Sequence, residues 1–158
     1  MKNSRVAAVY MEYADTVLRA VCNLTDRQTA EDCTQEAFLL LMKQDDSMTD
    51  AHILPWVIRT ALNLAKNHLK SAEHTRTESL DEHLDTVLDT DEDKITRTVF
   101  RALQKVPEHY RVPLYLHIVE GYTVRETAKI LGLKLGTAAT SIRRGKKLLQ
   151  AAFREEEL

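Results

Sequence analysis

The sequence has few of the residues that interrupt secondary structure. It contains 4 Gly and 3 Pro among 158 residues, too few for the many tight turns of a β-sandwich or barrel. No apolar run approaches the roughly 18 residues that indicate a membrane-spanning helix. Charges interrupt the N-terminal stretch too early for a signal peptide. These absences predict an all-α, cytoplasmic protein that is not inserted in a membrane.

Cysteine and histidine are also sparse, and their spacing is not typical of reactive sites. Cys22 and Cys33 lie outside a CxxC motif and fall on apolar helix faces, so we expect buried thiols. The 6 histidines show no metal-ligand spacing, and "GLKLGT" lacks the GxxxxGK[ST] pattern of a phosphate loop. No acid pair is placed by a catalytic motif. The sequence therefore predicts no enzyme, no cofactor and no metal site.

Acidic and basic residues nearly balance, but they alternate in blocks. The chain has 22 Lys and Arg against 24 Asp and Glu, a net charge of -2. Residues 71–95 are strongly acidic, residues 55–70 carry basic but no acidic side chains, and residues 123–158 are mostly basic. Blocks of opposite sign predict several surfaces that face different partners.

The most acidic block, "SAEHTRTESLDEHLDTVLDTDED", has few large apolar residues. It can bury too little surface to offset its ordering entropy, so we predict a flexible linker over residues 71–94. The linker separates two small helical domains, residues 1–70 and 95–158. Domains of this size bury only about 60% of their unfolded surface, so each is expected to be marginal alone. The apolar residues available for a transient helical turn in the linker are Leu80, Leu84, Val87 and Leu88.

Two amphipathic helices are predicted at the start of the first domain. The second of them is capped by Asp26 or Thr29 and presents the polar residues Asp32, Gln35 and Glu36 opposite its apolar face. Such a face is usually only solvated, so periodicity alone does not make it a site. The apolar stripes are Val6, Tyr10, Tyr13, Val17, Val21 and Leu24 on the first helix, and Ala30, Cys33, Ala37, Phe38 and Leu41 on the second.

A third helix is expected to begin at Pro55, because the missing N–H of proline costs nothing in a first turn. It carries Arg59, Lys66 and Lys70 and no acid. The residues expected to face the first two helices are Trp56, Ile58, Ala61, Leu62, Ala65 and Leu69.

The second domain is predicted to contain four helices. The first runs over residues 95–105, and the next over residues 108–120, where Pro113 should kink the helix or shift its start. Thr123 and Glu126 form a T-x-x-E capping box, so a third helix begins after them and ends at a glycine. That helix is expected to bury Val124, Ala128 and Leu131 before its stop at Gly132.

The last helix starts near Leu135 or Gly136 and completes a helix-turn-helix pattern, in which the second helix enters the major groove of DNA. Its inward positions are Ala138, Ile142, Gly145 and Leu149. The outward positions carry hydroxyls and guanidiniums that can meet phosphates and base edges: Thr137, Thr140, Ser141, Arg143, Arg144 and Lys147. Complementing the helix dipole would explain the C-terminal lysines, but not the hydroxyls.

Four stretches of the chain follow one another in a familiar order: "TAEDCTQEAFLLLMK", "LPWVIRTALNLAKNHLK", "ALQKVPEHYRVPLYLHIVEGYTVRETAKILGL" and "GTAATSIRRGKKLL". With these stretches the chain resembles the extracytoplasmic function type of bacterial RNA polymerase sigma factor. The resemblance implies a subunit that binds core polymerase, at the β′ clamp helices and the β flap, and promoter DNA. An anti-sigma factor is a further partner that the family suggests.

The resemblance also implies roles for individual residues. The polymerase-binding residues would be Glu31, Asp32, Gln35, Glu36 and Phe38. The residues that bind and open the downstream promoter element, together with the loop before the third helix, would be Arg59, Asn63, Lys66, Asn67 and Lys70. The residues that bind the upstream element would be Arg125, Thr137, Thr140, Ser141, Arg143, Arg144 and Lys147.

The recognition helix departs from the common family pattern "GTVKSRLHRARKKL". Two frequently basic positions are neutral, at Ala139 and Ser141, and an arginine stands at Arg143. This predicts an unusual upstream preference or a weak DNA contact. Two alternatives therefore stay open: a sigma-like adapter that binds polymerase or an anti-sigma factor without initiating, and a free-standing helix-turn-helix regulator.

Overall fold

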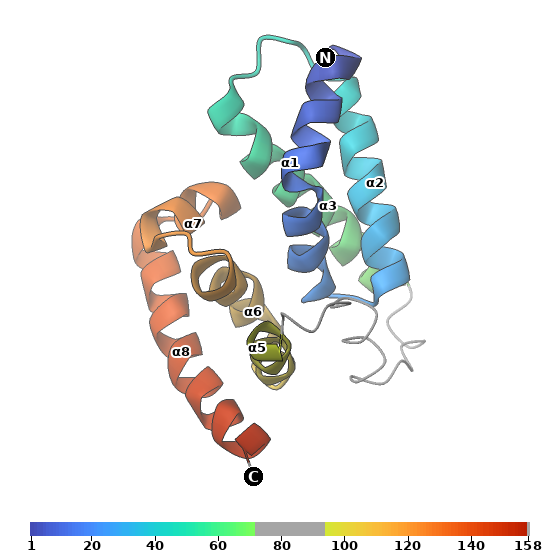
Figure 1. Ribbon diagram of the computed structural model, residues 1–158. Helices are drawn as coiled ribbons and strands as arrows, with labels where there is room; N and C mark the ends of the chain where they lie inside the picture. The colour runs from blue at the N-terminus through green and yellow to red at the C-terminus, as the bar shows by residue number, and fades with distance from the viewer. Residues whose placement is uncertain (72–93, 158) are drawn as a thin grey trace. The chain divides into compact units, whose positions relative to one another are not determined.

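The computed structural model describes residues 1–71 and 94–157, which fall into two compact helical units (Figure 1). Every regular element in these two stretches is a helix, which confirms the all-α prediction. The linker was predicted over residues 71–94, but its two ends are helical, since Ser71 ends one helix and Lys94 begins another. The rest of it, with its apolar residues, lies in residues 72–93, outside the described residues.

The N-terminal unit is a bundle in which each of three helices packs against the other two (Figure 1). The centre of the bundle holds fully buried side chains from all three helices: Val17 and Val21 from the first, Leu41 from the second and Ile58 from the third. Asp26 caps the second helix by accepting the N–H of Thr29 at 2.7 Å. The helices are α1 (Asn3–Cys22), α2 (Arg27–Met42) and α3 (Asp50–Ser71).

The predicted start of the third helix is wrong. α3 begins at Asp50, and Pro55 lies inside it. Ile53 and Leu54, in the turn before the proline, are 1% and 8% exposed, so burial of these two side chains stabilises the additional turn. The proline forfeits only one backbone hydrogen bond near the helix start, which tertiary packing offsets.

Several predicted core positions lie at the edge of the bundle. Tyr10 is 42% exposed and makes an edge-on contact with Phe38, with ring centroids 5.0 Å apart. Trp56 and Leu69 are half-buried, whereas Val57, absent from the predicted set, is fully buried. An aromatic ring at the edge of a small core keeps one face in water, which periodicity does not reveal.

Both cysteines are buried thiols, as predicted. Burial, followed by the nearby carboxylates Glu36, Asp32 and Asp26, raises the pKa of Cys33 from 9.0 to about 11. The folded state therefore holds the thiol proton more tightly than the unfolded state. The stability that this contributes is fully present below pH 9.0 and is lost as the pH rises toward 11.

We expect iodoacetamide to modify Cys33 very slowly in the folded protein at pH 8. The raised pKa lowers the thiolate fraction by about 100-fold, and burial blocks access. Mass spectrometry of the Cys33 peptide at timed quenches measures the rate. The same reaction in denaturant is the control and should be fast, whereas equal rates in both states would contradict the buried placement.

The C-terminal unit is built around its last and longest helix. This helix packs against the first two helices of the unit, and a short π-helical segment packs beside them. Phe100 and Tyr115, both fully buried, meet edge-on with ring centroids 5.8 Å apart. The elements are α5 (Lys94–Gln104), α6 (Glu108–Leu114), η2 (Tyr115–Val119), α7 (Val124–Leu131) and α8 (Leu135–Glu157).

Pro113 does not shift the start of its helix, which ends one residue after it. α6 begins at Glu108 as predicted, and the chain continues past the proline into the π-helical segment η2. Glu120 N–H donates to the carbonyl of Tyr115 at 3.2 Å, closing the wider turn. Proline has no N–H to donate within the helix, and the chain after it adopts the wider winding.

The capping box is confirmed. Thr123 N–H donates to Glu126 Oε1 at 2.9 Å, and Glu126 N–H donates to Thr123 Oγ1 at 3.0 Å. Gly132, with φ of 68°, ends α7 in the left-handed conformation that glycine adopts without strain. Val124 and Leu131 are only half-buried, while Thr127 and Ala128 are buried, so the inward face is rotated from the predicted one.

The predicted inward face of the last helix is confirmed. Ala138, Ile142 and Leu149 are 0%, 2% and 3% exposed, and Gly145 is buried beside Leu114. A Cβ added at Gly145 would lie 2.7 Å from Leu114 Cδ1 and 2.9 Å from Leu114 Cγ. The glycine thus permits the close approach of α8 to α6.

Gly145→Ala is expected to lower the free energy of unfolding by about 1 kcal/mol. Overpacking typically costs about 1–3 kcal/mol, which exceeds the roughly 1 kcal/mol that alanine contributes in a helix interior. Urea unfolding followed by circular dichroism measures the change. Gly136→Ala, where nothing lies within 4 Å of an added Cβ, is the control and should not destabilise. A Gly145→Ala protein as stable as wild type would mean that Leu114 moves aside freely.

Candidate protein and nucleic-acid interfaces

The polar face of α2 is the first candidate interface. Asp32, Gln35 and Glu36 are exposed, and Gln28 Nε2 donates to Asp32 Oδ1 at 3.2 Å along the same face. Glu31 lies at the edge, where it accepts from Arg27 Nε at 2.7 Å. Its charge is therefore partly neutralised, and the free negative charge is concentrated at Asp32 and Glu36.

Two residues change the predicted composition of this face. Phe38 is 5% exposed and packs on Tyr10, so it supports the face from the core and offers little surface to a partner. Leu39, which was not among the predicted residues, is 60% exposed and follows Asp32 and Glu36 at helical spacing. In the sequence, the signal that could have identified Leu39 was an apolar residue at helical spacing from outward polar residues. We refer to Asp32, Gln35, Glu36 and Leu39 as the α2 face.

The third helix presents a second surface of opposite character. All five predicted residues are exposed, and each lies three or four positions from another of them, so they share one side of α3. The only acidic residue in the helix is Asp50, in the first turn. This side therefore combines positive charge with amide groups that can donate and accept hydrogen bonds. Its members, the α3 face, are Arg59, Asn63, Lys66, Asn67 and Lys70.

The third surface lies at the start of α8. Arg143, Arg144 and Lys147 are exposed and point away from the buried side of the helix, while Thr140 and Ser141 are half-buried at its flank. Arg125, on α7, is also exposed. Hydroxyls near the helix and guanidiniums farther out are the groups that contact phosphates and base edges.

Of these residues, Thr140, Ser141 and Arg144 border an open concavity of about 680 Å³ between α6 and α8. His109 and Tyr110, whose rings lie 4.0 Å apart, form the α6 wall. His109 and Tyr110 were not predicted as site residues, because only the packing of α6 on α8 brings them to this place. Lys134, which directly precedes α8, was not predicted either. The α8 side consists of Lys134, Gly136, Thr137, Thr140, Ser141 and Arg144.

Two further properties concern only the described stretches, residues 1–71 and 94–157. None of their helices has the length and apolar content to cross a lipid bilayer. No three His, Cys, Asp or Glu side chains in these stretches gather as ligands of a metal ion.

The sequence matches two family models in the order in which the two units occur. Sigma-70 region 2 matches residues 9–75, and Sigma-70 region 4 matches residues 96–149, so that together they take in most of the chain. The first match includes the residues of the α2 and α3 faces, and the second includes Arg125 and the exposed residues at the start of α8.

Curated relatives and a solved structure agree with these matches. The chain is 28% identical to the ECF RNA polymerase sigma factor SigE of Mycolicibacterium smegmatis, over 88% of this chain and 58% of that protein. It is 26% identical to the RNA polymerase sigma-H factor of Pseudomonas aeruginosa, over 90% and 83% of the two chains. The fold is shared with the sigma factor RpoE of Bartonella quintana, which was solved in complex with the anti-sigma factor NepR. The two structures match with a TM-score of 0.67 at 15% identity, over 94% of this chain and 96% of that chain.

The chain therefore belongs to the sigma-70 family of RNA polymerase sigma factors, in its extracytoplasmic function (ECF) group. Members of this family are transcription initiation factors and carry no catalytic site of their own. The resemblance predicted from the sequence motifs is confirmed.

Proposed function

We propose that this chain is a promoter-specificity subunit that binds core RNA polymerase, recognises two promoter elements and melts the downstream one. The observation that carries the proposal is the order of three surfaces: an acidic face on α2, an acid-free basic face on α3, and a basic recognition helix in a separate unit. Residues 1–70 would serve polymerase and the downstream element, and residues 95–158 the upstream element.

The α2 face is proposed to bind the β′ clamp helices of polymerase. Its free carboxylates at Asp32 and Glu36 supply the charge that attracts a basic partner. Leu39 supplies the apolar centre that protein interfaces place inside a polar rim. Phe38 is assigned a supporting role because it is buried.

The α3 face is proposed to bind the melted downstream element. A single strand needs a positive track for its phosphates and hydrogen-bonding groups for unstacked bases. Arg59, Lys66 and Lys70 provide the track, and Asn63 and Asn67 lie between them on the same side. No carboxylate on this side of the helix opposes the approach of the backbone.

The start of α8 is proposed to read the upstream element in duplex DNA. Arg144 lies at the rim of the concavity and is the candidate for bidentate contact with a guanine. Thr137, Thr140 and Ser141 offer hydroxyls to the phosphates. Because Ala139 and Ser141 carry no charge, Arg143 and Arg144 would supply a larger share of the affinity than in most relatives.

The remaining partners follow from the same proposal. The acidic residues 71–94 would connect the two DNA-binding domains, and the C-terminal domain would contact the β flap. An anti-sigma factor is the candidate regulator, because the solved sigma factor RpoE was captured with one. The protein would act in the cytoplasm, where polymerase is found.

Transcription of fragmented genomic DNA by sigma-free core polymerase tests the proposal. Transcripts are expected only when the purified chain is added, and their start points should lie downstream of a shared pair of short motifs. Binding to core polymerase without any transcript would favour the adapter. Binding to duplex DNA without binding to polymerase would favour the free-standing regulator.

A further inference from the structure

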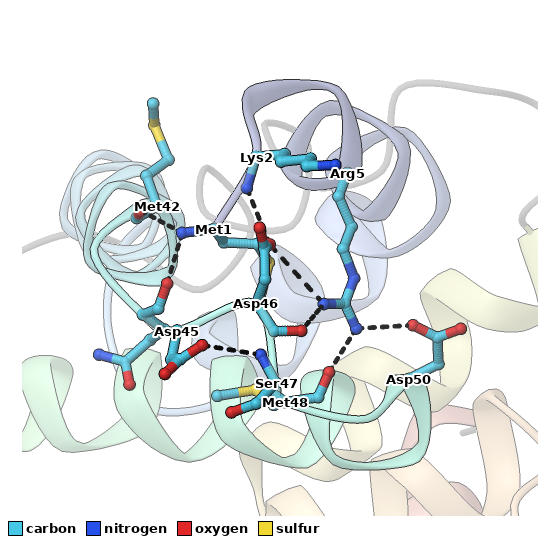
Figure 2. A network of polar contacts seen from close by, with 10 residues as sticks. Met1, Lys2, Arg5, Met42, Asp45, Asp46, Ser47, Met48 and Asp50 are labelled. Atoms are coloured by element: carbon cyan, nitrogen blue, oxygen red, sulfur yellow. Dashed lines mark hydrogen bonds and ion pairs between the residues drawn. The ribbon is translucent and has the colours of Figure 1, made fainter.

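The segment between α2 and α3 is held in place by the start of α1. The guanidinium of Arg5 donates to the carbonyl of Asp46 at 2.8 Å, to the carbonyl of Met48, and to Asp50 Oδ1 at 2.9 Å (Figure 2). One side chain thus connects three points of residues 43–50, which we call the α2–α3 loop. The loop includes the first residue of α3.

Backbone groups add to this attachment. Lys2 N–H donates to Asp46 Oδ1 at 3.0 Å, and the nitrogen of Met1 donates to the carbonyls of Met42, at 2.9 Å, and Gln44 (Figure 2). Within the loop, Ser47 N–H donates to Asp45 Oδ1 at 3.0 Å. The loop is therefore tied at its beginning, its middle and its end.

The contribution of Arg5 is mainly geometric. Its ion pair with Asp50 is worth little, because the Asp50 side chain is 95% exposed and water screens the attraction. The two bonds to carbonyl oxygens are different, because they fix the path of the backbone and the Arg5 side chain is only 27% exposed. A lysine cannot reproduce this pattern, since only guanidinium is a rigid fork of several donors.

The charges of the loop explain why a fixed path matters. Its sequence, "KQDDSMTD", contains three aspartates and one lysine, so attraction to phosphates cannot draw a DNA strand onto it. Arg5 lies 3.9 Å from Asp46 and 2.9 Å from Asp50, and it places a positive charge between these two carboxylates. Preorganisation and local neutralisation both lower the cost of binding a strand beside the loop.

We propose that Arg5 is a positioning residue for promoter opening, which holds the α2–α3 loop in the shape that accepts the melted strand at the start of α3. The inference rests on the proposed function, which assigns strand binding to α3, and extends that role to the loop before the helix, as the family resemblance implies. It adds Arg5, which is distant from the loop in the sequence and acts by holding the loop without contacting DNA itself.

The test compares Arg5→Ala and Arg5→Lys with Lys2→Ala, in holoenzyme assembled with core polymerase on a promoter found by the genomic assay. Lys2→Ala removes the same charge three residues away and keeps the backbone bond to Asp46. Each variant is assayed on duplex promoter and on the same promoter with its downstream element already unpaired. Permanganate footprinting of the duplex reports strand opening, and competition for core polymerase reports assembly.

Arg5→Ala is expected to reduce opening and transcription on the duplex about 10-fold, with transcription restored on the unpaired template and core binding unchanged. Arg5→Lys should resemble Arg5→Ala, and Lys2→Ala should resemble wild type. Hydrogen exchange of residues 44–49 should be faster in Arg5→Ala than in Lys2→Ala.

Two results would overturn the inference while leaving the proposed function intact. Arg5→Ala could open the duplex as well as wild type, or it could lose core binding and both templates equally, which would make Arg5 only a structural residue. Failure of wild-type protein on both templates would instead refute the proposed function, and the inference with it.

Discussion

Reversing the charges of Asp32 and Glu36 together is expected to weaken binding to core polymerase by at least about 100-fold. Both carboxylates are exposed on the α2 face, so the folded domain tolerates the change. Like charges brought together across an interface cost several kcal/mol, and about 1.4 kcal/mol corresponds to a factor of ten. Titration of fluorescently labelled core polymerase with Asp32→Lys/Glu36→Lys protein measures the loss.

Asp15→Lys is the matched control for this experiment. It reverses an exposed carboxylate of the same unit, on α1 and outside the α2 face. The control should bind core polymerase nearly as well as wild type, and both proteins should show the same circular dichroism. Unchanged affinity in the double variant would mean that the α2 face contacts water and no partner. This is the interpretation that helical periodicity alone favoured.

Arg144→Ala is expected to weaken binding to the upstream promoter element by about 10- to 100-fold while sparing binding to polymerase. A bidentate contact between arginine and guanine is worth roughly 1–3 kcal/mol of discrimination. The effect should be large here because the neighbouring positions Ala139 and Ser141 are neutral. Fluorescence anisotropy with duplexes that carry the wild-type and single-base-changed element measures both affinity and discrimination.

Lys146→Ala is the control that distinguishes recognition of a base by Arg144 from general attraction between positive charge and DNA. It removes one positive charge from the same helix, two residues further along, at an exposed position that does not border the concavity. We expect a small loss that is uniform across sequences and a shallower dependence on salt. Equal loss of DNA and polymerase binding in Arg144→Ala would contradict the assignment of separate surfaces.

Local patterns predicted most of the helices, and the places where they failed have a common cause. The Thr123 and Glu126 capping box and the inward positions of α8 depend on neighbours in the chain, and both are present in the structure. The start of α3 and the exposure of Tyr10 depend on what packs against them from other helices. Propensity around Pro55 could not reveal that Ile53 and Leu54 have a core to fill.

The candidate sites divide in the same way. The polar face of α2 and the outward residues of α8 could be listed from helical spacing, because side chains three and four apart share a side. For Phe38, helical spacing predicted a buried position and the family resemblance implied a polymerase-binding one, and its 5% exposure agrees with the spacing. The wall of the concavity at His109 and Tyr110 required the packing of α6 on α8.

The sequence by itself determined the helical class and the family, because these depend on composition, periodicity and the order of motifs. Only the tertiary structure decided that Gly145 lets α8 approach Leu114 and that Arg5 holds a loop 41 to 45 residues away. These features join residues that are distant in the chain. Their geometry is set by how the helices pack, which no local pattern encodes.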